Sequence, residues 1–303
     1  MRRNLIFLIF MEIETMLFLI CSILASVSVA ALLKVARQRG LSIEQMVASN
    51  YVIATILTIA FLQPQTQLGS LNFSGSQIAL FVALGVLLPT IFIAMGRSVA
   101  VAGIVKSDAA QRLSLFLPVL AAFTIFGETI LPHRLVGLIL AIFALLLVLH
   151  KPHNNTATSE QGAAKWLLAV WLGYGVIDIL FKQLSKQGAA FSGSLLVVFV
   201  LAGALMFAYL LSKNTLWHKN NLLAGALLGC LNFMNILFYI KAHQAFKDSP
   251  TLVFAGMNMG VIVLGTLVGG LAFHEKVNKL NYLGVILALC AIVMLYFGQI
   301  LFQ

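Results

Sequence analysis

Apolar runs of about 20 residues recur along the whole chain, separated by short polar stretches. About 20 helical residues cross the ~30 Å hydrocarbon core of a bilayer, so runs of this length are typical of transmembrane helices. The polar stretches between them, of which 63–76 and 151–164 are the longest, leave no room for a separate soluble domain. We predict an all-helical integral membrane protein with ten spans, at 15–37, 44–62, 77–97, 107–126, 132–150, 164–186, 191–211, 221–242, 251–273 and 279–300.

Composition excludes several other classes of protein. Apolar residues make up 61% of the 303 residues and charged residues only 9%, whereas soluble domains carry about 25% charged residues. A soluble enzyme, a nucleic-acid-binding module and a disordered chain are therefore excluded. The net charge of +10 indicates lysines and arginines at membrane edges. The expected partner is the lipid bilayer, with no nucleic acid.

The two halves of the sequence repeat each other. At a shift of 147 residues, Phe126, Glu128 and Gly137 match Phe273, Glu275 and Gly284; Lys34 matches Lys182 at a shift of 148, and Leu84, Gly85 and Arg97 match Leu228, Gly229 and Lys241 at 144. We predict two five-helix repeats, 1–150 and 151–303. An odd number of spans per repeat inserts the halves with opposite orientation. This inverted plan is typical of secondary transporters, whose substrate site lies near the membrane midplane.

The ends of both halves resemble a known family. Phe126-Gly127-Glu128 is followed by Gly137, and Phe273-His274-Glu275 by Gly284. With ten helices and a five-helix duplication, this pattern resembles the EamA-type ten-helix branch of the drug/metabolite transporter superfamily, and the resemblance covers about residues 15–300. The dipeptide Lys241-Ala242 and the lysines at 34 and 182 also fit. His274, where the family usually has glycine, and the charged segment 103–118 depart from it.

The resemblance implies a carrier of a small metabolite or drug-like solute, often an exporter, that works by alternating access. It does not identify the substrate. It places both chain termini in the cytoplasm, whereas the distribution of Lys and Arg between the loops favours both termini outside. Short loops and the lack of a targeting peptide suggest a bacterial inner membrane, and the protein is expected to be a monomer or homodimer.

Ionisable residues inside spans are the strongest candidates for function, because they are costly there and usually face the bundle interior. Asp178 and Lys182 lie four residues apart on one helix face. They either neutralise each other or form a site in which Lys182 binds an anionic group of the substrate. Lys34, the repeat counterpart of Lys182, is either a substrate contact or a lysine that extends to the membrane edge.

The start of the fourth span is unusually polar. Asp108 and Arg112 are spaced for an ion pair, and Gln111 and Arg112 near a helix N-terminus are suited to bind a carboxylate or phosphate. A solvated helix start is the alternative. Pro118 in the same span is expected to kink the helix and free a backbone carbonyl.

Other polar or aromatic side chains within spans are either substrate ligands or interhelical contacts. They are Asn50, Tyr51, Trp171, Tyr174, Asn232, Asn235, Lys241 and Asn258. Trp171 and Tyr174 share a helix face and either line a cavity or pack against a neighbour. Asp108, together with Glu128 and Glu275 at helix ends, is a candidate coupling or gate residue, and the two glutamates are otherwise structural caps.

No nucleotide, metal or nucleophile motif is present, so no cofactor and no enzymatic activity are predicted. Two alternatives to a transporter are open. One is a membrane scaffold or regulatory subunit, whose polar groups only hold helices together. The other is a membrane-embedded enzyme acting on lipid, which would need a cluster of His, Asp or Glu at one membrane face.

Overall fold

The computed structural model describes residues 2–65, 74–129, 131–149, 162–187, 190–274 and 278–301. Within these ranges the regular structure is helical, without strands. Nine of the described helices are long and apolar enough to cross a membrane. The chain is therefore an all-helical protein with the features of a multi-pass membrane protein.

In the part of the chain that the structure describes, the first half contains six helices. They are α1 (Arg2–Gln38), α2 (Ile43–Leu62), α4 (Gly75–Ala102), α5 (Ile104–Leu113), α6 (Phe116–Thr124) and α7 (Pro132–Leu149). The second half contains five, which are α8 (Ala163–Ser185), α9 (Phe191–Ser212), α10 (Lys219–Ala245), α11 (Pro250–Phe273) and α12 (Lys279–Leu301). Nine of the ten predicted spans thus coincide, within a few residues at most ends, with a helix of membrane length; in α1 the apolar part is Met16–Gln38.

The structure divides the predicted span 107–126 into α5 and α6, close to Pro118, where a kink was predicted. The break at Ser114 and Leu115 lies one turn before Pro118. A proline has no N–H for the carbonyl four residues earlier, here that of Ser114, and its ring crowds that carbonyl. The Ser114 hydroxyl donates to the carbonyl of Gln111 at 2.6 Å. The Trp171 indole N–H donates to the carbonyl of Leu113 at 3.0 Å. A neighbouring helix therefore supplies a hydrogen-bond donor at the break.

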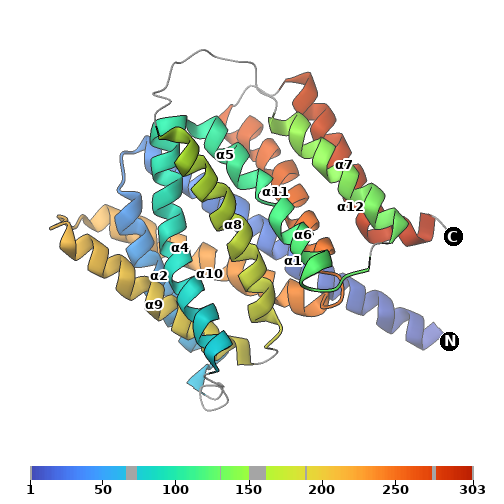
Figure 1. The fold of residues 1–303 in the computed structure, drawn as a ribbon, viewed down its shortest axis with the longest axis horizontal. Coiled ribbons are helices and arrows are strands. Elements are labelled where there is room, and N and C mark those ends of the chain that lie inside the picture. Colours follow the sequence, from blue (N-terminus) through green and yellow to red (C-terminus); the bar gives the residue numbers. More distant parts are fainter. Residues whose placement is uncertain are drawn as a thin grey trace.

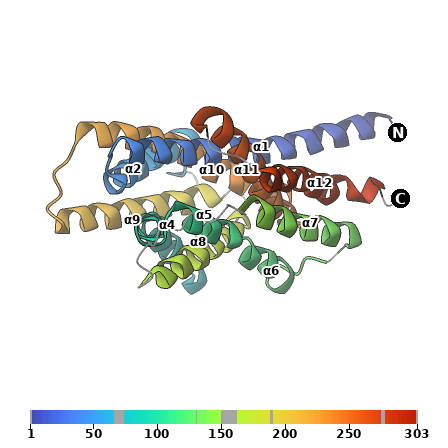
Figure 2. The ribbon, with the colours of Figure 1, turned by 90° about the horizontal axis from the view of Figure 1, so that it is seen from above.

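Figures 1 and 2 show how helices from the two halves interleave. α12 lies along α7, and α10 packs against both α1 and α2. α4 packs against α8 and α9, and α11 against α1 and α12. The marked N and C ends lie on the same side of the molecule in both views. Most helix contacts therefore join one half of the chain to the other.

Glycines allow the closest of these approaches, as expected for helices that gain little from hydrophobic burial against lipid. On α10, a Cβ at Gly225 would lie 2.5 Å from the Met46 carbonyl oxygen of α2, and one at Gly229 would lie 2.8 Å from the Asn50 carbonyl oxygen. Backbone atoms of a packed helix cannot move aside cheaply. The spacing between α2 and α10 thus depends on glycine at these positions.

We expect Gly225→Ala to destabilise the protein, because the added methyl group meets α2 backbone. Overpacking of this kind costs about 1–3 kcal/mol and should lower the thermal unfolding midpoint in detergent by several degrees. Gly265→Ala on α11 is the matched control, since a Cβ there meets nothing within 4 Å. Equal midpoints for the two variants would contradict the close contact of α2 with α10.

Candidate functional site

A cavity of about 170 Å³ lies among helices of both halves. The first half contributes residues of α1, α4 and α5 and the turn after α5, and the second half residues of α8, α10 and α11. The polar or charged lining residues are Ser26, Gln111, Arg112, Ser114, Tyr174, Asp178, Asn232, Asn235, Tyr239 and Asn258. The remainder are Leu88, Ile91, Phe92, Ile177, Phe181, Ile236, Met257 and Val261. The cavity therefore offers charged and amide groups within an apolar wall.

The structure brings together many of the predicted binding residues. Those in the lining are Gln111, Arg112, Tyr174, Asp178, Asn232, Asn235 and Asn258. The candidates Lys34, Asn50, Tyr51, Trp171, Lys182, Lys241, Asp108 and Glu128 are not among the lining residues. Glu275 lies outside the described residues. Whether any lining residue binds a substrate stays a prediction.

Asp178 and Lys182 have different partners, so the interpretation that they neutralise each other is wrong. The Asp178 carboxylate faces the cavity and accepts a hydrogen bond from the Tyr239 hydroxyl at 3.0 Å. The Lys182 ammonium donates to two backbone carbonyls at the end of α10, those of His243 at 3.3 Å and Lys247 at 2.8 Å. Although i and i+4 positions share a helix face, Lys182 is drawn to the negative end of α10.

Arg112 and Asp108 form the predicted ion pair on α5, with 3.5 Å between nitrogen and oxygen. The prediction that Gln111 and Arg112 lie near a helix N-terminus is wrong, because α5 begins at Ile104 and both residues lie in its last turn. The Arg112 side chain is 19% exposed and that of Asp108 44%. A surface-facing pair of this kind contributes little to stability, so Arg112 remains available to a ligand in the cavity. Tyr174 on α8 lies within electrostatic range of both residues and of Asp178.

Two of the cavity asparagines are partly engaged with helices. The Asn235 side-chain oxygen accepts from the Ser22 hydroxyl of α1 at 2.9 Å. The Asn258 amide donates to the Phe254 carbonyl of its own helix at 3.0 Å. Each amide has further hydrogen-bonding groups, namely the Asn235 nitrogen and the Asn258 oxygen. They complement Asp178 and Arg112 as donors and acceptors at the cavity wall.

The remaining candidates pack between helices. Asn50 is fully buried and Tyr51 is 1% exposed. Among the residues that the structure describes, neither the Asn50 amide nor the Tyr51 hydroxyl has a hydrogen-bond partner. The ammonium of Lys34 lies 4.0 Å from the centre of the Phe273 ring, and that of Lys241 lies 5.4 Å from the Phe18 ring. Trp171 packs against a neighbouring helix at the α5–α6 break, which is one of the two roles considered for it.

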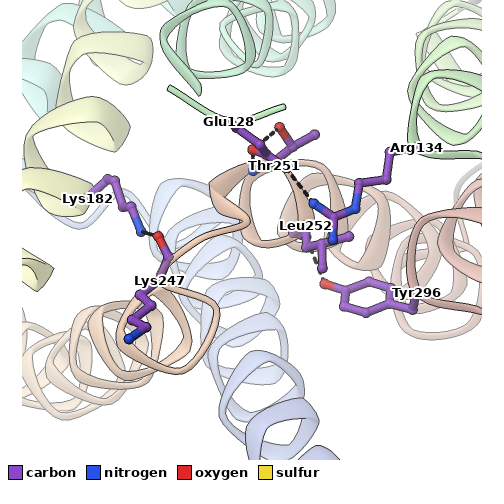
Figure 3. A network of polar contacts seen from close by, with 7 residues as sticks. All are labelled: Glu128, Arg134, Lys182, Lys247, Thr251, Leu252 and Tyr296. Carbon is purple, nitrogen blue, oxygen red and sulfur yellow. Dashed lines mark hydrogen bonds and ion pairs between the residues drawn. The ribbon is translucent and has the colours of Figure 1, made fainter. Parts of the chain in front are cut away.

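Glu128 binds the start of α11 across the boundary between the halves (Figure 3). Its carboxylate accepts from the Thr251 amide at 2.8 Å and from the Thr251 hydroxyl at 2.6 Å. Arg134 of α7 donates to its other oxygen at 3.0 Å. A carboxylate that accepts N–H bonds at the positive end of a helix is stabilising. Glu128 thus caps α11, which is the structural role considered for it.

Sequence reasoning missed Tyr239, Ser26 and Ser114 in the cavity. Tyr239 follows Asn232 and Asn235 at helical spacing, so the stripe on this face of α10 carried a usable signal. Serines such as Ser26 are common in membrane helices as interhelical contacts, and nothing in its sequence context distinguishes it. Within the described ranges no three His, Cys, Asp or Glu side chains are grouped to hold a metal ion.

Comparison with known proteins places the chain among its relatives. No family model matches it. A Haemophilus influenzae protein, described as uncharacterized, is 49% identical over 284 residues, which cover 92% of this chain and 97% of the relative. The chain belongs to the family of this protein. A solved crystal structure with 15% sequence identity superposes with a TM-score of 0.72, covering 94% of this chain and 97% of the other. At that identity the likeness shows a shared fold alone.

We expect Glu128→Ala in this protein to destabilise the junction between the two halves of the chain. The change leaves Arg134 and the Thr251 amide without their carboxylate, and hydrogen bonds to charged groups contribute about 1.5–3 kcal/mol. Glu128→Gln should lose less, because its amide oxygen can still accept from Thr251.

Thermal unfolding in detergent would measure both variants. Asp248→Ala, an exposed acidic residue in the neighbouring turn, is the control and should unfold like the unmodified protein. If Glu128→Ala unfolds at the temperature of that control, the carboxylate does not hold α11.

Proposed function

We propose that the protein is a secondary transporter of a small metabolite or drug-like solute, working by alternating access between two inverted five-helix repeats. The observation that carries the proposal is the cavity, which is polar, lies within a bundle of membrane-length helices and takes its walls from both halves. Burying charged and amide groups inside such a bundle costs free energy, and residues of this kind usually mark functional sites. α5 and α6 together would form the tenth, broken span.

Contacts made by matched glycines support the inverted repeat. A Cβ at Gly137 on α7 would lie 2.9 Å from Leu295 on α12, and one at Gly284 on α12 would lie 2.7 Å from Val148 on α7. The shift of 147 that pairs the two glycines also pairs Val148 with Leu295. The two contacts are therefore equivalent under the repeat, as a twofold relation between the halves requires.

A second pair of glycines behaves in the same way. A Cβ at Gly85 on α4 would lie 2.5 Å from Leu201 on α9, and one at Gly229 on α10 would lie 2.7 Å from Ile53 on α2. Leu201 and Ile53 match at a shift of 148. The neighbours of whole helices agree with this relation, because α1 packs against α10 and α11 as α8 packs against α4 and α5–α6.

The backbone supports the repeat at its ends. Gly127 has a φ of 68° and its counterpart His274 a φ of 51°. Both lie in the left-handed region that glycine adopts without strain. The histidine that departs from the family pattern thus keeps the conformation that the pattern requires. This agreement, together with the Phe-x-Glu ends and the ten predicted spans, supports membership of the EamA-type branch of the drug/metabolite transporters.

We place the protein in a bacterial inner membrane, since the 49% identical relative is bacterial and the fold is a helical bundle. It works as a monomer or homodimer without a cofactor, and its partners are the bilayer and the solute. Export is the proposed direction, and the resemblance favours both termini in the cytoplasm. The solute is polar or amphipathic, because the cavity combines Asp178 and Arg112 with apolar side chains.

Proteoliposomes loaded with a mixture of small metabolites would test this function. We expect at least one solute to leave faster than from protein-free liposomes. Asp178→Asn and Arg112→Gln should each slow that flux about tenfold or more, the effect of losing roughly 1.4 kcal/mol of binding. Lys219→Gln, which also removes a charge but at an exposed position at the start of α10, should leave the flux unchanged. If no solute moves although the reconstituted protein is folded, a scaffold role replaces the proposal.

A further inference from the structure

The turn that joins α10 to α11, residues 246–249, is fastened from both halves of the chain (Figure 3). From the second half, the Lys182 ammonium binds the carbonyls of His243 and Lys247, and the residue is only 1% exposed. From the first half, Glu128 binds the first turn of α11 through Thr251. A helix C-terminus leaves its last carbonyls without partners inside the helix. Here a buried ammonium group donates hydrogen bonds to two carbonyls at this end.

This turn lies just beyond one end of the cavity. Phe181 and Tyr239 line the cavity and pack edge to face, with ring centres 6.3 Å apart. His243 lies one helical turn further along α10, fully buried between the rings of Tyr239 and Phe254. Lys182 follows Phe181 directly. The aromatic layer and the lysine together close the cavity on this side.

The opposite end of the cavity is less enclosed. Arg112 lines it, and the side chain of Asp108, one turn away along α5, is 44% exposed. At the other end of the cavity, His243 lies one turn beyond the lining residue Tyr239 along α10, and its side chain has no exposure. The structure is therefore a conformation closed at the α10–α11 turn.

The repeat provides a counterpart for each part of this closure. Lys34 matches Lys182, and the shift of 144 that pairs Arg97 with Lys241 also pairs His243 with Val99 and Lys247 with Gly103. Val99 and Gly103 lie at the turn between α4 and α5, where Gly103 has a φ of 84°. In this conformation the Lys34 ammonium lies 4.0 Å from the centre of the Phe273 ring.

We propose that Lys182 and Lys34 are alternating positioning residues of the transport cycle. Lys182 holds the α10–α11 turn closed in the present conformation. In the opposite conformation Lys182 releases that turn, and Lys34 binds the carbonyls of Val99 and Gly103 to close the α4–α5 turn. The Val99 carbonyl accepts the bond from Lys34 through its other lone pair. At the Gly103 carbonyl the ammonium replaces the Ser107 hydroxyl, which donates there at 2.9 Å in the present conformation. The inference rests on the proposed function, since two conformations of an inverted repeat are required for the exchange.

Labelling of a single cysteine reports which end is closed. Ser185, one turn beyond Lys182 on α8 and 4% exposed, is replaced by cysteine after Cys21, Cys230 and Cys290 are changed to serine. The protein in lipid nanodiscs is then exposed to a membrane-impermeant maleimide. Lys182→Met should raise the labelling rate about tenfold, since hydrogen bonds to a charged group are lost. Lys182→Arg keeps the cation and should restore most of the closure.

Lys34→Met should act in the opposite direction and lower the labelling rate, because it removes the contact that favours the other conformation. The double variant should label at a rate between those of the two single variants. Lys165→Met, at an exposed lysine near the opposite end of α8, is the matched control and should label like the unmodified protein. Thermal unfolding of every variant shows that it is folded, and Lys34→Met tests the exchange even if Lys182→Met fails to fold.

Equal labelling of the Lys34→Met variant and the unmodified protein, or a change in the same direction for both lysines, would overturn the proposal. The flux measurement in proteoliposomes separates this outcome from failure of the transport function. If flux is present and the labelling rates do not diverge, the exchange is wrong and the transporter stands. If the labelling rates diverge as expected and no solute moves, the two lysines switch the conformation outside any transport cycle, and the transport function is wrong.

Discussion

Every backbone N–H and C=O within the membrane must find a partner inside the protein, because lipid offers none. Continuous helices meet this requirement by themselves, and ends or breaks do not. The structure places a side chain at several such points. Trp171 binds the carbonyl freed at the α5–α6 break, Lys182 binds carbonyls at the end of α10, and Asn281 binds the Val148 carbonyl at the end of α7 at 2.8 Å. Glu128 does the same for the N–H groups that begin α11.

These polar contacts also explain why several candidate residues have structural partners. A buried lysine or glutamate is costly unless its charge is satisfied, and a helix end is a ready partner of the right sign. Lys182 and Glu128 therefore bind the two sides of one turn. Asp178 and Arg112 differ from them, because both line the cavity, where a solute can reach them. The division of the few charges into helix caps and cavity groups is the basis for assigning them different roles.

The contacts between the halves depend on matched small residues. Gly137 and Gly284 bring α7 and α12 together, and Gly85 and Gly229 allow α4 and α10 to approach α9 and α2. A glycine surface permits close packing without interlocking large side chains. Helices packed in this way can pivot against each other while backbone hydrogen bonds stay intact. The proposed movement of one repeat against the other would use such pivoting.

The sequence by itself indicated that the protein lies in a membrane, and it indicated most of the helices. Both follow from the length of the apolar runs and the scarcity of charged residues, which are local properties. The sequence also indicated the repeat and the i, i+4 pair of Asp108 and Arg112. It did not determine the partners of Asp178 and Lys182, which share a helix face but bind Tyr239 and the end of α10. Those partners lie about 60 residues away, and only tertiary packing brings them close. The sequence predicted a kink at Pro118. That Trp171 donates a hydrogen bond at this break was decided by how α8 packs against α5.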